Sequence, residues 1–110
     1  MHYRVFFYFG ASGAKISSAK AVEMSLEDIS EKLLERLVAN GDYLGLIDDQ
    51  DQVLQIAREA GDRFWVELPV DAAYASYGCY LDLAGLKELL DTLPKRFERS
   101  AFPELQYRPW

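Results

Sequence analysis

The chain has 110 residues, half of them hydrophobic, and its 12 basic and 18 acidic side chains give a net charge of −6 at pH 7. This length predicts one globular domain over residues 1–110, and the negative charge argues against binding to nucleic acid or to an anionic membrane. One cysteine excludes an internal disulfide, and the sequence has no apolar run of the roughly 20 residues that a membrane-spanning helix needs. We therefore expect a cytoplasmic location.

The acidic side chains are concentrated in the middle of the chain. Residues 23–91 carry 16 acidic and 5 basic side chains, whereas both flanking segments are weakly basic. The segment from Asp42 to Gln55 contains Asp48, Asp49 and Asp51 and no Lys or Arg. Such a charge run is usually a solvated surface, and the alternative interpretation is a site for a basic partner.

The first elements are a strand, an extended segment and a helix. Residues 3–9 are rich in aromatic and β-branched side chains and run into a glycine turn, which predicts a strand. Residues 15–22 predict an edge strand or an extended segment. Ser25 is a candidate N-cap for a helix that ends at Asn40 and Gly41. Its expected buried stripe is Leu26, Ile29, Leu33 and Leu37.

Three segments with alternating apolar side chains follow, and they predict antiparallel strands with one buried face. Pairing Leu46 with Leu54 leaves a three-residue loop at 49–51, and pairing Ile56 with Phe64 leaves a second loop at 59–61. The inward side chains are then Leu44, Leu46, Leu54, Ile56, Phe64, Val66 and Leu68.

The opposite face of these strands is a candidate contact surface. It carries Tyr43, Gln55, Trp65 and Glu67, and the predicted register places Gln55 across from Trp65 and Val53 across from Glu67. A covering helix would favour more aliphatic residues here. Aromatic, amide and carboxylate side chains can instead be buried at an interface while they still offer hydrogen bonds.

The last third of the chain predicts a loop, a helix and a tail. Residues 72–80 lack a clean period and predict a loop with at most a short strand. Asp82 can cap a second helix that ends before Pro94, with Leu83, Leu86, Leu89 or Leu90, and Leu93 directed inward. Residues 95–110 predict a docked, partly irregular tail. The expected fold class is α+β, an antiparallel sheet of about four to five strands packed on one face by two helices.

No group of residues predicts catalysis. The segment 10–15 contains two glycines and a lysine, but their spacing does not match a phosphate-binding loop. The acids at 48–51 lack the central glycine and the distant glutamate of a helix-loop-helix calcium site. Cys79 and His2 lack an orienting third group. We therefore predict no catalytic residue, no metal site and no cofactor.

The order of elements resembles that of small bacterial immunity proteins of polymorphic toxin systems. The strands Tyr43-Leu44-Gly45-Leu46-Ile47 and Val53-Leu54-Gln55-Ile56-Ala57, a glycine turn and the strand Phe64-Trp65-Val66-Glu67-Leu68 carry most of the resemblance, which extends over about residues 24–93. The resemblance implies a protein that binds a cognate toxin and blocks its active site or a necessary conformational change.

Our leading hypothesis is a non-enzymatic protein-binding domain whose partner is a cognate protein with basic character, such as a toxin domain. Acidic side chains would steer the encounter, and aromatic side chains would anchor the contact. The predicted partner-binding residues are Tyr43, Asp48, Asp49, Asp51, Gln55, Trp65 and Glu67. One alternative is a self-associating structural or regulatory domain that forms a homodimer through the same face. The other is a small ligand-binding protein or enzyme with a pocket near Tyr74, Tyr77 and Cys79.

Overall fold

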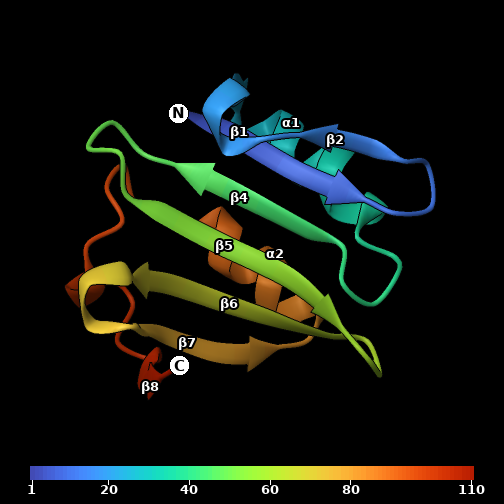
Figure 1. Ribbon diagram of the computed structural model, residues 1–110. Coiled ribbons are helices and arrows are strands. Elements are labelled where there is room, and N and C mark those ends of the chain that lie inside the picture. Colours follow the sequence, from blue (N-terminus) through green and yellow to red (C-terminus); the bar gives the residue numbers. More distant parts are fainter.

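One antiparallel sheet of eight strands forms the centre of the protein, and two helical segments lie on one of its faces (Figure 1). The computed structural model describes residues 1–110, apart from the side chain of Asp71. The strand order is β2-β1-β4-β5-β6-β7-β8, and β3 continues the β2 edge by pairing with the first half of β1. The strands are β1 (His2–Phe9), β2 (Ala14–Ile16), β3 (Val22–Ser25), β4 (Tyr43–Ile47), β5 (Val53–Glu59), β6 (Arg63–Val70), β7 (Ala75–Leu81) and β8 (Gln106–Pro109).

The helical segments are short. The first runs from α1 (Leu26–Asp28) through the π-helix η2 (Ile29–Leu33) into the 3-10 turn η3 (Leu34–Arg36), and the second is α2 (Leu83–Asp91). Single 3-10 turns form η1 (Ser18–Lys20), η4 (Asp71–Ala73) and η5 (Arg99–Ala101). In the described part of the chain, no helix combines the length and the apolar character that crossing a membrane requires.

The α+β class and the antiparallel sheet are confirmed, but the sheet is larger than the predicted four to five strands. The segment expected at 15–22 is divided into β2 and β3 by η1, and residues 75–81 form a full strand where a loop with at most a short strand was expected. Ala75 is buried, and Tyr77, Cys79 and Leu81 pack against the core. The alternation is weak in the sequence, because several side chains are small and the aromatic Tyr80 lies on the opposite face.

The two central hairpins test the predicted registers. The β4–β5 register is confirmed, because Leu46 lies opposite Leu54. The β5–β6 register is wrong by two residues: Val66, and not Phe64, lies opposite Ile56. A shift of two residues leaves every side chain on its predicted face, so the apolar alternation could not distinguish the two registers.

The observed β5–β6 register is accompanied by favourable contacts of the Arg58 side chain. It lies opposite Phe64, and its guanidinium carbon is 5.2 Å from the centroid of that ring. The same guanidinium donates a hydrogen bond of 2.9 Å to the carbonyl oxygen of Leu37 and pairs with Asp62. The turn is made by residues 60–62, and Gly61 and Asp62 both have positive φ, at 74° and 62°.

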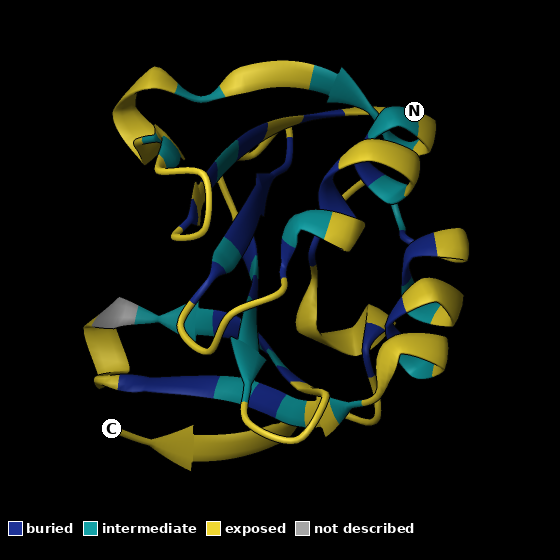
Figure 2. Ribbon diagram, turned by 90° about the vertical axis from the view of Figure 1, so that its right-hand side faces the viewer, coloured by how far each residue is buried: buried dark blue, intermediate teal, exposed yellow. Residues whose placement is uncertain are grey.

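The core lies between the sheet and the helical segments, as the burial colours of Figure 2 show. The predicted helix stripe is largely confirmed, since Ile29, Leu33 and Leu37 are buried, and Leu34 is buried as well. A π-turn adds one residue to the helical repeat, which brings two successive leucines to the core side. The sheet contributes these buried side chains to the main core cluster: Tyr3, Val5, Phe7, Phe9, Leu44, Leu46, Leu54, Ile56, Phe64, Val66 and Leu68.

Both predicted helix caps are present. The Ser25 hydroxyl accepts a hydrogen bond of 3.1 Å from the backbone N–H of Asp28, and an Asp82 carboxylate oxygen accepts one of 2.8 Å from that of Gly85. Leu86, Leu90 and Leu93 are buried, as expected. Leu83 was predicted to point inward, but this first residue of α2 is exposed.

The C-terminal segment packs against the domain. Phe97, Phe102 and Leu105 are buried, and Phe97 stacks on Tyr3 with ring centroids 5.3 Å apart. The chain then forms β8 along the outer edge of β7. This last strand was not predicted, because its partner lies about 30 residues earlier and all four of its residues are exposed.

Candidate functional site

The face of the sheet opposite the helices carries no layer of helix or sheet. We call it the open face. Figure 2 shows the helices on one side of the sheet and the β2–η1 segment projecting on the other. A hollow of about 630 Å³ lies on the open face, with Ser18 of η1 at one margin and Trp110 at another. The backbone N–H of Trp110 donates a hydrogen bond of 2.8 Å to the carbonyl oxygen of Tyr74, which fixes the chain at that margin.

Two aromatic rings pack directly over glycines of the open face. A Cβ atom on Gly45 would be 2.0 Å from the Phe6 ring, and a Cβ atom on Gly78 would be 2.3 Å from the Trp65 indole. Each ring therefore occupies the space that a side chain on the neighbouring strand would fill. This packing keeps both rings low on the sheet, and it explains why each of the two strands has glycine at this position.

We expect the substitution Gly45→Ala to lower the free energy of unfolding by about 1–3 kcal/mol, because the added methyl group collides with the Phe6 ring. The measurement is urea unfolding of both proteins. The matched background is the Phe6→Ala variant, which lacks the ring. In that variant, Gly45→Ala should lower the free energy of unfolding by less than about 0.5 kcal/mol, because alanine is otherwise the better strand residue. Equal costs in the two backgrounds would contradict the proposed contact.

The two rings belong to separate aromatic groups. Phe6 packs edge-on against Tyr43 with ring centroids 6.3 Å apart, and Tyr43 also lies 6.1 Å from Tyr8. On the other side of the hollow, the Trp65 ring is 4.9 Å from that of Tyr80. Arginines lie over this second group: the guanidinium of Arg63 is 4.5 Å from the Tyr80 ring centroid, and that of Arg108 is 5.4 Å from the Trp65 centroid.

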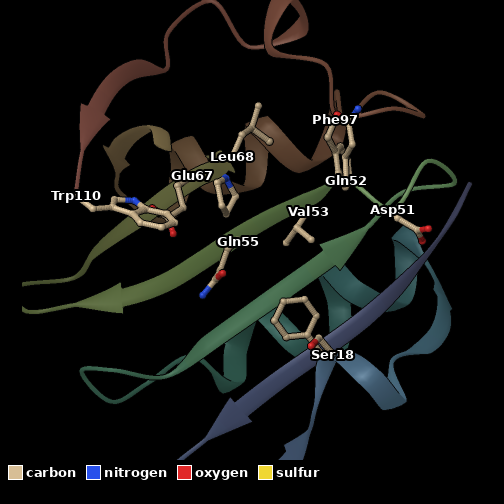
Figure 3. Close-up of a pocket in the computed structure, with 11 residues that line it drawn as sticks. Ser18, Asp51, Gln52, Val53, Gln55, Glu67, Leu68, Phe97 and Trp110 are labelled. Carbon is tan, nitrogen blue, oxygen red and sulfur yellow. The ribbon is translucent and has the colours of Figure 1, made fainter. Parts of the chain in front are cut away.

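Glu67 and Gln55 lie between these groups. One carboxylate oxygen of Glu67 accepts a hydrogen bond of 2.7 Å from the indole Nε1 of Trp65. Gln55 is the cross-strand neighbour of Glu67, and both line the hollow. Figure 3 shows Glu67 beside Trp110 at one end of the hollow, Asp51 toward the other end, and Val53 with Gln55 on the floor between them.

Four of the predicted partner-binding residues therefore share the open face. Tyr43, Gln55, Trp65 and Glu67 are all half-buried there. Their neighbours differ from the prediction because of the register shift: Ala57 lies across from Trp65, and Gln55 lies across from Glu67. The shift brings the amide and the carboxylate together and leaves the indole to pack on Gly78.

The aspartates of the β4–β5 hairpin were predicted to bind a partner, and their surroundings in the structure differ from that prediction. Asp48 is buried, and its carboxylate accepts three backbone hydrogen bonds, from Gln50, Gln52 and Phe97 at 2.8, 2.9 and 2.7 Å. Asp48 therefore stabilises the hairpin from within, and its carboxylate oxygens are not accessible to a partner. Asp49 and Asp51 are exposed, but the fold supplies the basic partners that the local sequence lacks: Arg96 lies 3.3 Å from Asp49, and Arg4 pairs with Asp51.

Asp42, the first acid of the run from Asp42 to Gln55, is also buried. Burial alone would raise the pKa of its carboxyl, but hydrogen bonds from the backbone N–H groups of Gly10, Ala39 and Val38, together with the charge of Arg58, lower it overall. The carboxylate fastens the loop before β4 to the end of β1. The run therefore contains two internal acids and two paired acids.

The structure also shows where the residues of the alternative pocket near Tyr74 lie. Tyr77 and Cys79 point toward the helix side of the sheet, where Cys79 lies opposite Val66, and Tyr74 is exposed. Burial, and then the charge of Glu104, raises the pKa of the Cys79 thiol, and Arg108 lowers it by less. The thiol form is therefore favoured at neutral pH.

Several residues of the hollow were not predicted as site residues, among them Phe6, Pro69 and Trp110. Phe6 could have been found, because alternation along residues 3–9 places it on the opposite face from Val5 and Phe7. Pro69 and Trp110 gave no such signal, since their place in the hollow follows from the length of β6 and from the hydrogen bond between Trp110 and Tyr74.

The open face presents a hollow surrounded by aromatic, amide and carboxylate side chains. Its hollow is within the size range of small-molecule sites, about 300–1,000 Å³, and is large enough for several side chains of another protein. Comparison of the chain with protein-family models, with curated proteins and with solved structures gave no match. The open face is therefore the feature from which a function can be inferred.

Proposed function

We propose that the chain is a non-enzymatic protein-binding domain that receives a cognate protein on the open face of its sheet. Following the resemblance of its elements to bacterial immunity proteins, we propose that the partner is a toxin domain, which the chain neutralises by direct binding. The single observation that carries the proposal is the concave, half-buried arrangement of aromatic, amide and carboxylate side chains around the hollow.

This arrangement has the composition of a protein-binding hot spot. Such sites are enriched in Trp, Tyr and Arg, and they bury these side chains at the centre of the contact. Here Trp65 is held by Gly78 beneath it and by Glu67 at its Nε1 atom. A partner would therefore meet an indole whose conformation is already fixed, and it would lose little side-chain entropy on binding.

The acidic hairpin has a smaller part in this proposal than its sequence implied. Asp49 and Asp51 are each paired with an arginine at the rim, and exposed ion pairs of this kind contribute little. Their role in the proposal is to steer the encounter with a basic partner, which affects the association rate more than the affinity.

The proposal is tested by recovering the partner from the native organism, purifying it and measuring its affinity for variants of the chain. We expect Trp65→Ala to weaken binding by about 2 kcal/mol, roughly thirtyfold in Kd, because it removes the indole that Gly78 and Glu67 hold on the open face. Asp49→Ala should cost less than about 1 kcal/mol. Trp65→Phe retains a ring over Gly78 and should lie between these values.

The folded state of each variant is checked by thermal unfolding. Equal affinity of wild type and a folded Trp65→Ala variant would overturn the placement of the interface. The toxin proposal has its own test: the recovered partner should stop growth when expressed alone, and co-expression of the wild-type chain should restore growth. A homodimer in sedimentation equilibrium that shields Trp65 from fluorescence quenchers would instead favour self-association through the same face.

A further inference from the structure

The charges inside the hollow point to the chemistry of the group that enters it. Asp51 and Glu67 are the charged residues that line the hollow, and Arg4 already pairs with Asp51 from the rim. Within the part of the chain that the structure describes, no Lys, Arg or His nitrogen lies within ion-pair distance of Glu67. The hollow therefore contains a half-buried carboxylate that lacks a cation.

The nearby arginines are oriented toward aromatic rings. Arg63 lies over Tyr80 and Arg108 lies over Trp65, so neither forms an ion pair with Glu67. The Trp65 indole occupies one oxygen of the carboxylate through Nε1. A carboxylate can accept about four hydrogen bonds, so Glu67 retains most of its capacity for a donor that arrives from outside.

The surroundings of Glu67 suit a cationic side chain. Gln55 lies across from it and adds an amide oxygen as a second acceptor. Trp110 lines the same end of the hollow, as Figure 3 shows, and an indole face attracts a cation that is partly removed from water. Val53 and Pro69 provide apolar surface for the methylene groups of a long side chain.

We infer that the hollow receives an arginine or lysine side chain of the partner protein, with its cationic group against Glu67 and Gln55 and its stem along Val53 and Pro69. This inference rests on the proposed function, and it deepens that function by naming the partner's anchor. Charge complementarity selects this occupant, because an anionic group would face the Glu67 carboxylate, and a neutral apolar group would cover that charge without supplying a cation.

The probe is N-acetyl-arginine amide, added to the 15N-labelled protein and followed by NMR. We expect saturable shifts of the Gln55 and Glu67 backbone amides and of the Trp65 and Trp110 indole N–H signals. N-acetyl-citrulline amide has nearly the same shape without the charge, and it should bind at least about tenfold more weakly. The lysine counterpart should bind at the same signals, because it carries the same charge.

The substitution Glu67→Gln keeps an acceptor for the Trp65 indole and removes the charge. We expect it to weaken binding of the arginine probe at least about tenfold. Glu59→Gln is the matched control, because Glu59 is half-buried on the neighbouring strand and does not line the hollow. It should leave binding unchanged.

Equal binding of the arginine and citrulline probes, or full binding to Glu67→Gln, would overturn the inference. Stronger binding of N-acetyl-glutamate amide would also overturn it. The recovered partner separates the two proposals: if Trp65→Ala weakens its binding and Glu67→Gln does not, the open face is the interface and the cationic anchor is wrong. If neither substitution matters, the proposed interface itself is wrong.

Discussion

The variant Asp48→Ala should unfold with a free energy about 3 kcal/mol below that of the wild type, measured by urea unfolding at pH 7. Its carboxylate satisfies the backbone N–H groups of Gln50, Gln52 and Phe97 in a buried place. Hydrogen bonds to a charged group contribute about 1.5–3 kcal/mol each, and removing the acceptor also leaves donors without a partner. The variant therefore loses all three hydrogen bonds. Local relaxation and the entry of water limit the resulting loss of unfolding free energy.

The same substitution should release the contact between the β4–β5 hairpin and the C-terminal segment. Phe97 donates its backbone N–H to Asp48 and stacks on Tyr3, so its amide proton should exchange much faster in the variant. Asp49→Ala is the control on the adjacent residue. It removes only an exposed pair with Arg96 and should change the free energy of unfolding by less than about 1 kcal/mol. Similar losses in both variants would contradict the internal role of Asp48.

Asp42 should make stability depend on pH at the acidic end. The pKa of its carboxyl is lowered in the folded protein, so the folded state binds a proton less readily than the unfolded chain. Its contribution is therefore fully present above the unfolded pKa of about 3.9 and is lost as the pH falls through the lower, folded pKa. Urea unfolding between pH 7 and pH 2.5 measures this loss.

The substitution Asp42→Asn should lower the free energy of unfolding by about 2–3 kcal/mol at pH 7, because an amide cannot accept all three backbone hydrogen bonds and its NH₂ group would face a donor. The difference from the wild type should shrink as the pH falls through the lowered pKa of folded Asp42, where the carboxylate itself becomes protonated. Asp62→Asn is the control, since Asp62 is exposed and pairs only with Arg58. A difference that stays constant from pH 7 to pH 2.5 would rule out the ionised carboxylate as its source.

These two acids explain why a local charge count misjudged the hairpin. Along the sequence, Asp42, Asp48, Asp49 and Asp51 form an uncompensated run. In the fold, the first two accept internal hydrogen bonds, and the other two meet arginines that are 47 residues away in the sequence. Partners at that separation have no signature in a local pattern.

The face of each central strand was predictable, but the contacts across the β5–β6 pair were not. Alternation assigned Gln55, Trp65 and Glu67 to the open side, and the two-residue shift preserved that assignment. The neighbours on that face changed, because the register depends on the turn at residues 60–62 and on the packing of Arg58 against Phe64. The turn and this packing depend on particular residues, so a periodic pattern of apolar side chains does not predict them.

The first helical segment ends at Arg36 and not at the predicted Asn40 and Gly41. Local patterns in the sequence were sufficient to predict the α+β class, the N-caps of both helical segments, the inward side of the central strands and the composition of the open face. Each of these follows from local rules of periodicity and capping that act within about ten residues. Only the folded structure shows that β7 and β8 extend the sheet, that Phe6 and Trp65 lie on glycines, and that Trp110 lines the hollow beside Glu67. Those features depend on pairing and packing between distant segments, where shape and not local pattern selects the partner.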